Sequence, residues 1–182
     1  MMAGESSDTV RQWLESFKQH EREKDEMYLE VGKAIVNLSV IEEYMASVFV
    51  ILSRPMAEDA AAAMFYESQN MAHKLKLVGY AVMRTDWAAG KRDWPTLSAK
   101  IGKQRFVRNL AAHASMGFTL EKDGKRWRLS LATQELDKKH KRTELKIADM
   151  KASADELDDL RRLIQEFLIR TLRHLGPEVA SS

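Results

Sequence analysis

Residues 28–52 read YLEVGKAIVNLSVIEEYMASVFVIL, and this stretch decides the fold. Its apolar residues recur every three or four positions, which predicts one amphipathic helix with a buried apolar face. The predicted inner face consists of Val31, Ile35, Leu38, Ile41, Met45, Val48 and Leu52. The helix should end at Ser53-Arg54-Pro55, because the residue before a proline is driven out of the helical region.

The same spacing predicts further core helices downstream. One spans about residues 58–83, with a bend at Gln69-Asn70. Residues 85–93 are predicted to form a loop, and a third helix follows over about 94–112. Pro95 suits the first turn of that helix, where its missing N–H costs nothing.

Residues 116–133 change to an alternating pattern, which is typical of strands. Asp123-Gly124 lies between the two alternating segments, and this dipeptide favours a two-residue hairpin turn. The resulting register pairs Leu120 with Trp127 and Phe118 with Leu129. Because these apolar partners then share one face, the sequence predicts a β-hairpin with one buried side.

The two ends of the chain predict further elements. The capping-box signature Ser153-Ala154-Asp155-Glu156 predicts the start of the last core helix, and Gly176-Pro177 predicts its end. Residues 143–147 alternate weakly and are a candidate third strand. Residues 1–26 predict a short extra helix followed by a charged connector from Gln19 to Glu26.

Together these elements predict a mainly α fold. We expect a four-helix bundle with an extra N-terminal helix and a β-hairpin of two or three strands inserted before the last helix. The expected organisation is a helix and connector at 1–26, a helical domain at 27–176 with its hairpin at 116–133, and a disordered tail at 177–182.

Composition narrows the class of protein. The chain has 182 residues, of which 45% are hydrophobic and 31% charged, and its net charge is +2. It contains no cysteine, which excludes disulfides and thiolate catalysis. No uninterrupted apolar run approaches a membrane span, and the N-terminus does not resemble a secretory signal. We therefore expect a cytoplasmic protein that does not enter a membrane.

Several enzyme classes lack their motifs. A di-iron bundle needs Glu-x-x-His pairs on facing helices, and none of the five histidines has a glutamate three residues earlier. The chain has no His-Glu-x-x-His, no Gly-x-Ser-x-Gly and no glycine-rich phosphate loop. We expect neither a metal nor a cofactor.

The clearest candidate for a catalytic or binding site is the hexapeptide Arg108-Asn109-Leu110-Ala111-Ala112-His113. Arg108 offers a planar permanent cation that matches a phosphate, and His113 can exchange a proton near neutral pH. Positions five apart diverge by about 140° on an ideal helix, so the two side chains converge only if the helix ends near His113 or Arg108 reaches around it. Asn109 is four residues before His113 and is therefore its neighbour.

The alternative interpretation is structural. An arginine near a helix end and a histidine among alanines are ordinary features of a helical protein. On this interpretation the chain is a helical dimerisation or scaffold protein without chemistry of its own.

The hexapeptide also resembles the R-x4-H signature of the HEPN superfamily (higher eukaryotes and prokaryotes nucleotide-binding domains). The resemblance covers about Tyr28 to Leu175, although only the hexapeptide is specific. It implies a HEPN-like four-helix bundle in which the signature lies in the third core helix. It also implies a homodimer in which two signatures face each other across one cleft.

The activity implied by the resemblance is that of a metal-independent endoribonuclease. Arg108 would bind the scissile phosphate, His113 would transfer protons, and Asn109 would orient His113 or the phosphate. Many relatives act in toxin–antitoxin or phage-defence systems, so the implied partners are RNA or a nucleotide and an antitoxin protein. Other relatives bind without cutting, which gives the alternative of a non-catalytic module for nucleotide, RNA or protein. Toxins paired with nucleotidyltransferase antitoxins usually carry a tyrosine two positions after the histidine, whereas this chain has Ser115.

Two further residues are candidates for supporting the site. Glu42 falls on the inward stripe of the first core helix, and a carboxylate facing a core requires a partner. We expect that partner to be Arg108 or Arg105, and the alternative is an edge position from which Glu42 reaches water. Lys100 and Lys103 lie near Arg105, and this basic group favours either a phosphate backbone or simple solubility.

Overall fold

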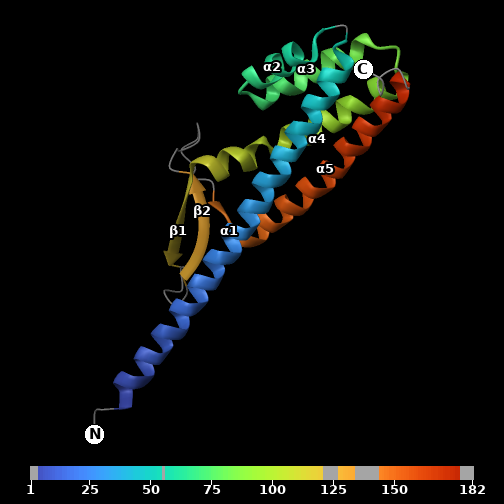
Figure 1. Cartoon of the computed structure of the whole chain (residues 1–182). Helices are drawn as coiled ribbons and strands as arrows, with labels where there is room; N and C mark the ends of the chain where they lie inside the picture. Colours follow the sequence, from blue (N-terminus) through green and yellow to red (C-terminus); the bar gives the residue numbers. More distant parts are fainter. Residues whose placement is uncertain (1–3, 55, 121–126, 134–143, 177–182) are drawn as a thin grey trace. The chain divides into compact units, whose positions relative to one another are not determined.

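A computed structural model describes residues 4–54, 56–120, 127–133 and 144–176. It contains five helices and three strands within these ranges (Figure 1). In chain order they are α1 (Gly4–Leu52), α2 (Glu58–Glu67), α3 (Met71–Arg84), α4 (Ala88–His113), β1 (Ala114–Leu120), β2 (Trp127–Thr133), β3 (Glu144–Leu145) and α5 (Ile147–Leu175). The prediction of a mainly helical protein is therefore confirmed. The predicted hairpin turn and the tail at 177–182 lie outside the described residues, as do the side chains of residues 4–10, 12, 13, 16, 105–128 and 130–144.

The chain divides into two compact units. The first unit comprises Met1–Lys33 and Asn109–Ala154, and the second comprises Ala34–Arg108 and Asp155–Ser182. The first unit contains the start of α1, the strands and the start of α5. The second contains the rest of α1, the helices α2 and α3, most of α4 and most of α5.

The predicted separate N-terminal helix and connector are wrong, because α1 is one helix of 49 residues. Its charged N-terminal part is rich in good helix formers, and their side chains pair one turn apart. Gln19 donates to Glu23 at 3.0 Å, and Lys24 lies 3.6 Å from Glu21. These local contacts continue the helix through a stretch whose charge pattern we had interpreted as a connector.

The buried face of α1 differs in its first half from the predicted one. Met27, Glu30 and Ala34 are buried, whereas Ile35 is 44% exposed. From Leu38 onward the predicted stripe is buried up to Val48, Ala46 and Phe49 are buried beside it, and Leu52 is half-buried at the end of the helix. The buried face over residues 27–34 contains a glutamate, so the spacing of apolar residues did not identify it.

The break between α2 and α3 confirms the predicted bend at Gln69-Asn70. Asn70 caps α3, since its side-chain oxygen accepts a hydrogen bond from the Ala72 N–H at 2.8 Å. The first helix ends at Leu52, before Ser53-Arg54-Pro55, as predicted.

Helix α4 begins earlier than predicted. It starts at Ala88, so Pro95 lies inside the helix and not in its first turn. The ring of Trp87 occupies the space that a side chain at Gly90 would need. Gly90 therefore permits close packing inside the helix, where the sequence had suggested a loop.

Helix α5 also begins earlier than predicted, at Ile147. The Asp149 carboxylate accepts a hydrogen bond from the Lys146 backbone N–H at 2.9 Å, which caps the first turn. The signature at Ser153 consequently lies within the helix. The predicted end is confirmed, because the helix finishes at Leu175 and Gly176 has φ +73°, a left-handed conformation that favours glycine.

The strands of the first unit form an antiparallel sheet in the order β1-β2-β3. Its register places Leu120 opposite Trp127 and Phe118 opposite Leu129. Leu129 is buried, as are Met27 and Met150 of the same unit.

The core of the second unit is built from one stripe of each long helix and several aromatic rings. Helix α5 contributes Leu157, Leu160, Ile164 and Phe167. The Phe167 ring lies 5.0 Å from Trp87 and 5.5 Å from Trp94, and the Phe49 ring lies 6.0 Å from Phe65, measured between ring centroids. These contacts join helices that are distant in sequence.

One segment of α1 qualifies as a membrane span by length and composition. The helix from Phe17 to Leu52 contains a window with a mean hydropathy of 1.7, of which 33% is buried within the protein. A single helix of this kind is weak evidence, so the expectation that the protein does not enter a membrane also stays a prediction. Core helices of soluble proteins satisfy the same criterion, so cytoplasmic location remains a prediction.

Candidate functional site

The hexapeptide occupies the last turns of α4. The helix ends at His113, and β1 begins at the next residue. The division between the two compact units falls between Arg108 and Asn109. The side chains of Arg105, Arg108, Asn109 and His113 lie outside the described residues, so their meeting in one groove remains a prediction.

The backbone alone still constrains this site. A helix end at His113 is one of the two conditions under which a residue five positions earlier can approach it. The last turn of a helix also presents unpaired carbonyl groups and the negative end of the helix dipole, which favour a cation.

Glu42 has a described partner that the sequence did not predict, while the side chains of Arg105 and Arg108 lie outside the described residues. The Glu42 carboxylate forms an ion pair with Lys74 of α3. Lys74 is only 4% exposed, whereas Glu42 is half-buried and its neighbour Glu43 is exposed. The pair thus joins α1 to α3 inside the second unit.

Aromatic rings surround the ammonium group of this ion pair. The Lys74 Nζ lies 5.2 Å from the centroid of the Phe65 ring and 5.6 Å from that of Tyr66. Partial burial raises the pKa of the Tyr66 hydroxyl, and the carboxylates of Glu43 and Glu42 raise it further. A lysine held by a carboxylate and two rings is committed to structure, so we assign this cluster to packing and not to chemistry.

Sequence reasoning missed Lys74, although a local signal exists. Lys74 follows Met71 by three residues and precedes Val78 by four, so it falls on the apolar stripe of α3. A cation on such a stripe requires a buried anion. Glu42, on the inner side of α1, was the corresponding carboxylate.

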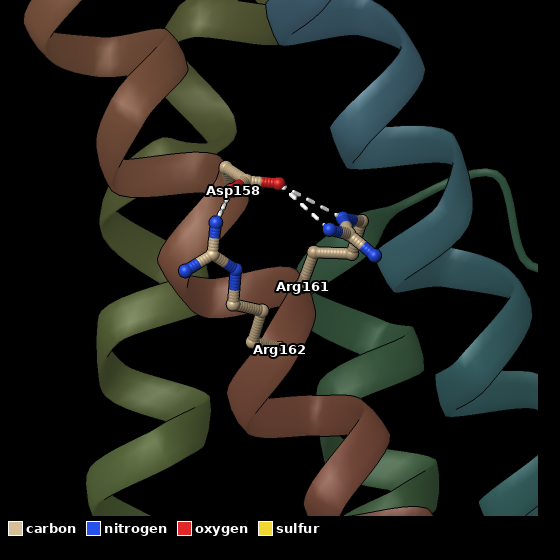
Figure 2. Close-up of polar contacts among 3 residues, drawn as sticks. All are labelled: Asp158, Arg161 and Arg162. Atoms are coloured by element: carbon tan, nitrogen blue, oxygen red, sulfur yellow. Dashed lines mark hydrogen bonds and ion pairs between the residues drawn. The ribbon is translucent and has the colours of Figure 1, made fainter.

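Asp158 forms the clearest charged cluster on the surface of the second unit (Figure 2). One carboxylate oxygen accepts from Arg161 at 2.8 and 3.1 Å, and the other accepts from Arg162 at 2.5 Å. The hydrogen bonds from Arg161 lower the pKa of Asp158, and Asp158 in turn raises the pKa of Arg161. The single Asp158 carboxylate thus holds both guanidinium groups, and the cluster keeps one net positive charge.

A second polar cluster lies near the end of α5. The His174 imidazole stacks on Trp87 with 5.6 Å between ring centroids, and its Nε2 lies 2.9 Å from an Asp86 carboxylate oxygen. No nucleophile among the described residues hydrogen-bonds to this histidine. The pair therefore lacks the third member that a hydrolytic triad needs.

Metal binding finds no support in the part of the chain that the structure describes. No group of three or more histidine, aspartate or glutamate side chains there is arranged to hold an ion.

Comparisons with known proteins do not identify a family. No protein-family model, no curated protein and no solved structure matches this chain.

Proposed function

We propose that this protein is a metal-independent endoribonuclease of HEPN type that acts as a homodimer. One observation carries the proposal: Arg108-Asn109-Leu110-Ala111-Ala112-His113 ends a long helix of a mainly helical protein. In this proposal α1, α3, α4 and α5 provide a HEPN-like four-helix bundle, and the strands are a hairpin inserted before its last helix. RNA is the substrate, and the protein works in the cytoplasm, in a toxin–antitoxin or phage-defence setting.

The proposed reaction divides the labour between a cation and an imidazole. Arg108 binds the scissile phosphate and stabilises the charge that develops on its oxygens. His113 accepts the proton of the ribose 2′-OH, whose oxygen attacks phosphorus. The bond from phosphorus to the 5′-oxygen breaks, and that oxygen receives a proton from the partner subunit's His113 or from water. The products are a 2′,3′-cyclic phosphate and a 5′-OH.

The supporting residues have narrower roles. Asn109 orients His113 or the phosphate, and Arg105 adds positive charge along the RNA backbone. Glu42 is not given a role at the site, because its described contact is with Lys74. Ser115 stands where related toxins carry the tyrosine that their antitoxin modifies, so regulation through that tyrosine is not part of the proposal.

The test is cleavage of mixed cellular RNA by the purified full chain in excess chelator. We expect cutting to persist in chelator and to fall at least about 100-fold in His113→Ala, the usual contribution of a proton-transferring side chain. Arg108→Ala should reduce it by about as much, because it removes the stabilisation of charge on the phosphate. The new 5′ ends should accept label from polynucleotide kinase without phosphatase treatment, because they carry a free hydroxyl.

Arg92→Ala is the matched control, since Arg92 is an exposed cation near the start of the same helix and outside the basic group around Arg105. It should cut at the wild-type rate. RNA cleavage that survives His113→Ala would refute the proposed mechanism. RNA binding without cleavage, if lost in Arg108→Ala, would instead assign the chain to the non-catalytic modules.

A further inference from the structure

The second unit contains an open cleft that the proposed nuclease site does not use. Its volume is about 950 Å³. Residues from the end of α1, from α2 and α3 and from the end of α5 supply its walls. Its apolar lining includes Phe49, Leu52, Met56, Met64, Leu77 and Tyr80.

The apolar side chains at this cleft are exposed to an unusual degree. Met56 is 40% exposed, Met64 44% and Tyr80 68%. Water-exposed apolar patches that are rimmed by polar groups mark interaction sites. Methionine side chains are flexible and polarisable, so they adapt to apolar partners of varied shape.

The charges at the rim leave one cation available. Arg54 lies 3.2 Å from Glu58, and Asp86 is engaged by His174. Arg84 is exposed and has no carboxylate partner within the described part of the chain. Because Arg84 follows Tyr80 by four residues on α3, the two side chains are neighbours on one helix face. The cleft therefore presents an apolar floor beside one uncommitted guanidinium group.

We propose that this cleft binds an amphipathic helix of a partner protein. Apolar side chains of that helix contact Met56, Met64 and Tyr80, and an acidic side chain pairs with Arg84. Three features favour this occupant. The cleft lies between helices, as grooves that accept helices do. Its volume is near the upper limit for small-molecule pockets and accommodates several side chains. Its rim combines tyrosine, arginine and methionine, which are enriched at protein interfaces.

The test is selection of binders from a phage-displayed library of randomised helical peptides against the full chain. We expect the selected peptides to carry apolar residues at spacings of three and four and an excess of aspartate and glutamate. Met64→Asp should weaken their binding at least about tenfold, measured by fluorescence anisotropy. Arg84→Glu should weaken it less, and replacing the acidic residue of the peptide by lysine should restore binding to that variant.

Two variants outside the cleft are matched controls. Met83→Asp and Lys76→Glu alter exposed residues of α3, the helix that carries Arg84, at positions that do not line the cleft. Both variants should bind the selected peptides as the wild type does. Circular dichroism melting of each variant separates loss of folding from loss of binding.

Three results would overturn the proposal. The first is a selection that yields no binder, and the second is peptides whose affinity ignores both Met64→Asp and Arg84→Glu. The third is displacement of an environment-sensitive dye by sodium dodecanoate, with no binding of selected peptides, which would assign the cleft to a small amphiphilic acid. None of these outcomes depends on RNA cleavage, so this proposal and the nuclease proposal fail independently.

Discussion

Two glutamates on the buried side of α1, Glu42 and Glu30, have different surroundings. In the second unit, Glu42 pairs with Lys74, an ammonium group that is itself buried beneath two aromatic rings. In the first unit, Glu30 is 4% exposed, and one of its oxygens lies 2.7 Å from Lys33. The side chain of Lys33 is 50% exposed, and the other oxygen, Oε2, has no hydrogen-bond partner among the residues that the structure describes.

The difference shows that the position of the partner decides whether a buried charge stabilises or destabilises the fold. A partner from another helix can enter the core with the carboxylate and satisfy it there. A partner three residues away on the same helix stays partly in water and reaches only one oxygen. A buried polar atom without a hydrogen bond costs about 1–3 kcal/mol, so Glu30 lowers stability where the Glu42–Lys74 pair fixes the packing of two helices.

The largest expected effect follows from removing the lysine. Lys74→Met should lower the free energy of unfolding by about 3 kcal/mol, because it leaves the Glu42 carboxylate beside an apolar core without a counter-charge. Urea denaturation followed by circular dichroism measures the change. The double variant Lys74→Met/Glu42→Leu should recover most of the loss, since it removes both charges. If the double variant is as unstable as the single one, the ion pair is not the cause.

Substitution of Glu30 should change stability in the opposite direction. Glu30→Met preserves the approximate volume and removes the unpartnered oxygen, so it should raise the free energy of unfolding by about 1 kcal/mol. The control is Glu43→Met, an exposed position on the same helix, which should be neutral within about 0.5 kcal/mol. A destabilised Glu30→Met would mean that the Lys33 contact outweighs the unsatisfied oxygen.

Alkaline pH should weaken the surroundings of Lys74 through Tyr66. Because the pKa of Tyr66 is raised in the folded protein, the unfolded chain ionises first. The contribution of Tyr66 to stability is complete below pH 10 and is lost as pH rises through the folded pKa. Tyr66→Phe should therefore flatten the decline of the melting temperature above pH 10. Tyr80→Phe, at a ring that is 68% exposed, is the matched control and should leave the slope unchanged.

The smallest effect should come from the exposed cluster at Asp158. Its pKa is lowered by Arg161, so its contribution is present above the unfolded value of 3.8 and is lost as pH falls below it. Asp158→Asn should make the free energy of unfolding fall less steeply below pH 4. Added salt should reduce the same pH dependence in the wild type, because it screens the exposed charges. An acid transition that is identical in the two proteins would show that the exposed cluster contributes nothing measurable.

The sequence predicted helices best where their apolar stripe was long and unambiguous. The second half of α1 and the break at Gln69-Asn70 follow from spacing and capping alone. The start of α1 could not be predicted in this way, because its charged residues form a helix through side-chain pairs and such a charged stretch also suits a loop. The start of α4 could not be predicted either, because Gly90 serves the packing of Trp87 and does not mark a turn.

Part of the candidate site could likewise be predicted from the sequence, and part could not. The hexapeptide and its place at a helix end could be anticipated, since both depend on adjacent residues. The partner of Glu42 could not, because Lys74 lies 32 residues away and the choice among several cations is made by tertiary packing. Glu42 lies half-buried on α1 and pairs with Lys74 of α3, which the sequence did not predict, whereas its predicted contact with Arg108 or Arg105 stays a prediction because those side chains lie outside the described residues.

The positions of the tryptophans allow the unfolding of the second unit to be followed by fluorescence. Of the four tryptophans, Trp87 and Trp94 contact Phe167 in the second unit, whereas Trp13 and Trp127 belong to the first. Replacing Trp13 and Trp127 by phenylalanine leaves tryptophan emission that originates from the second unit alone. Comparing the unfolding midpoint of that emission with the midpoint of helix loss then reveals whether the two units melt in a single cooperative transition or one after the other.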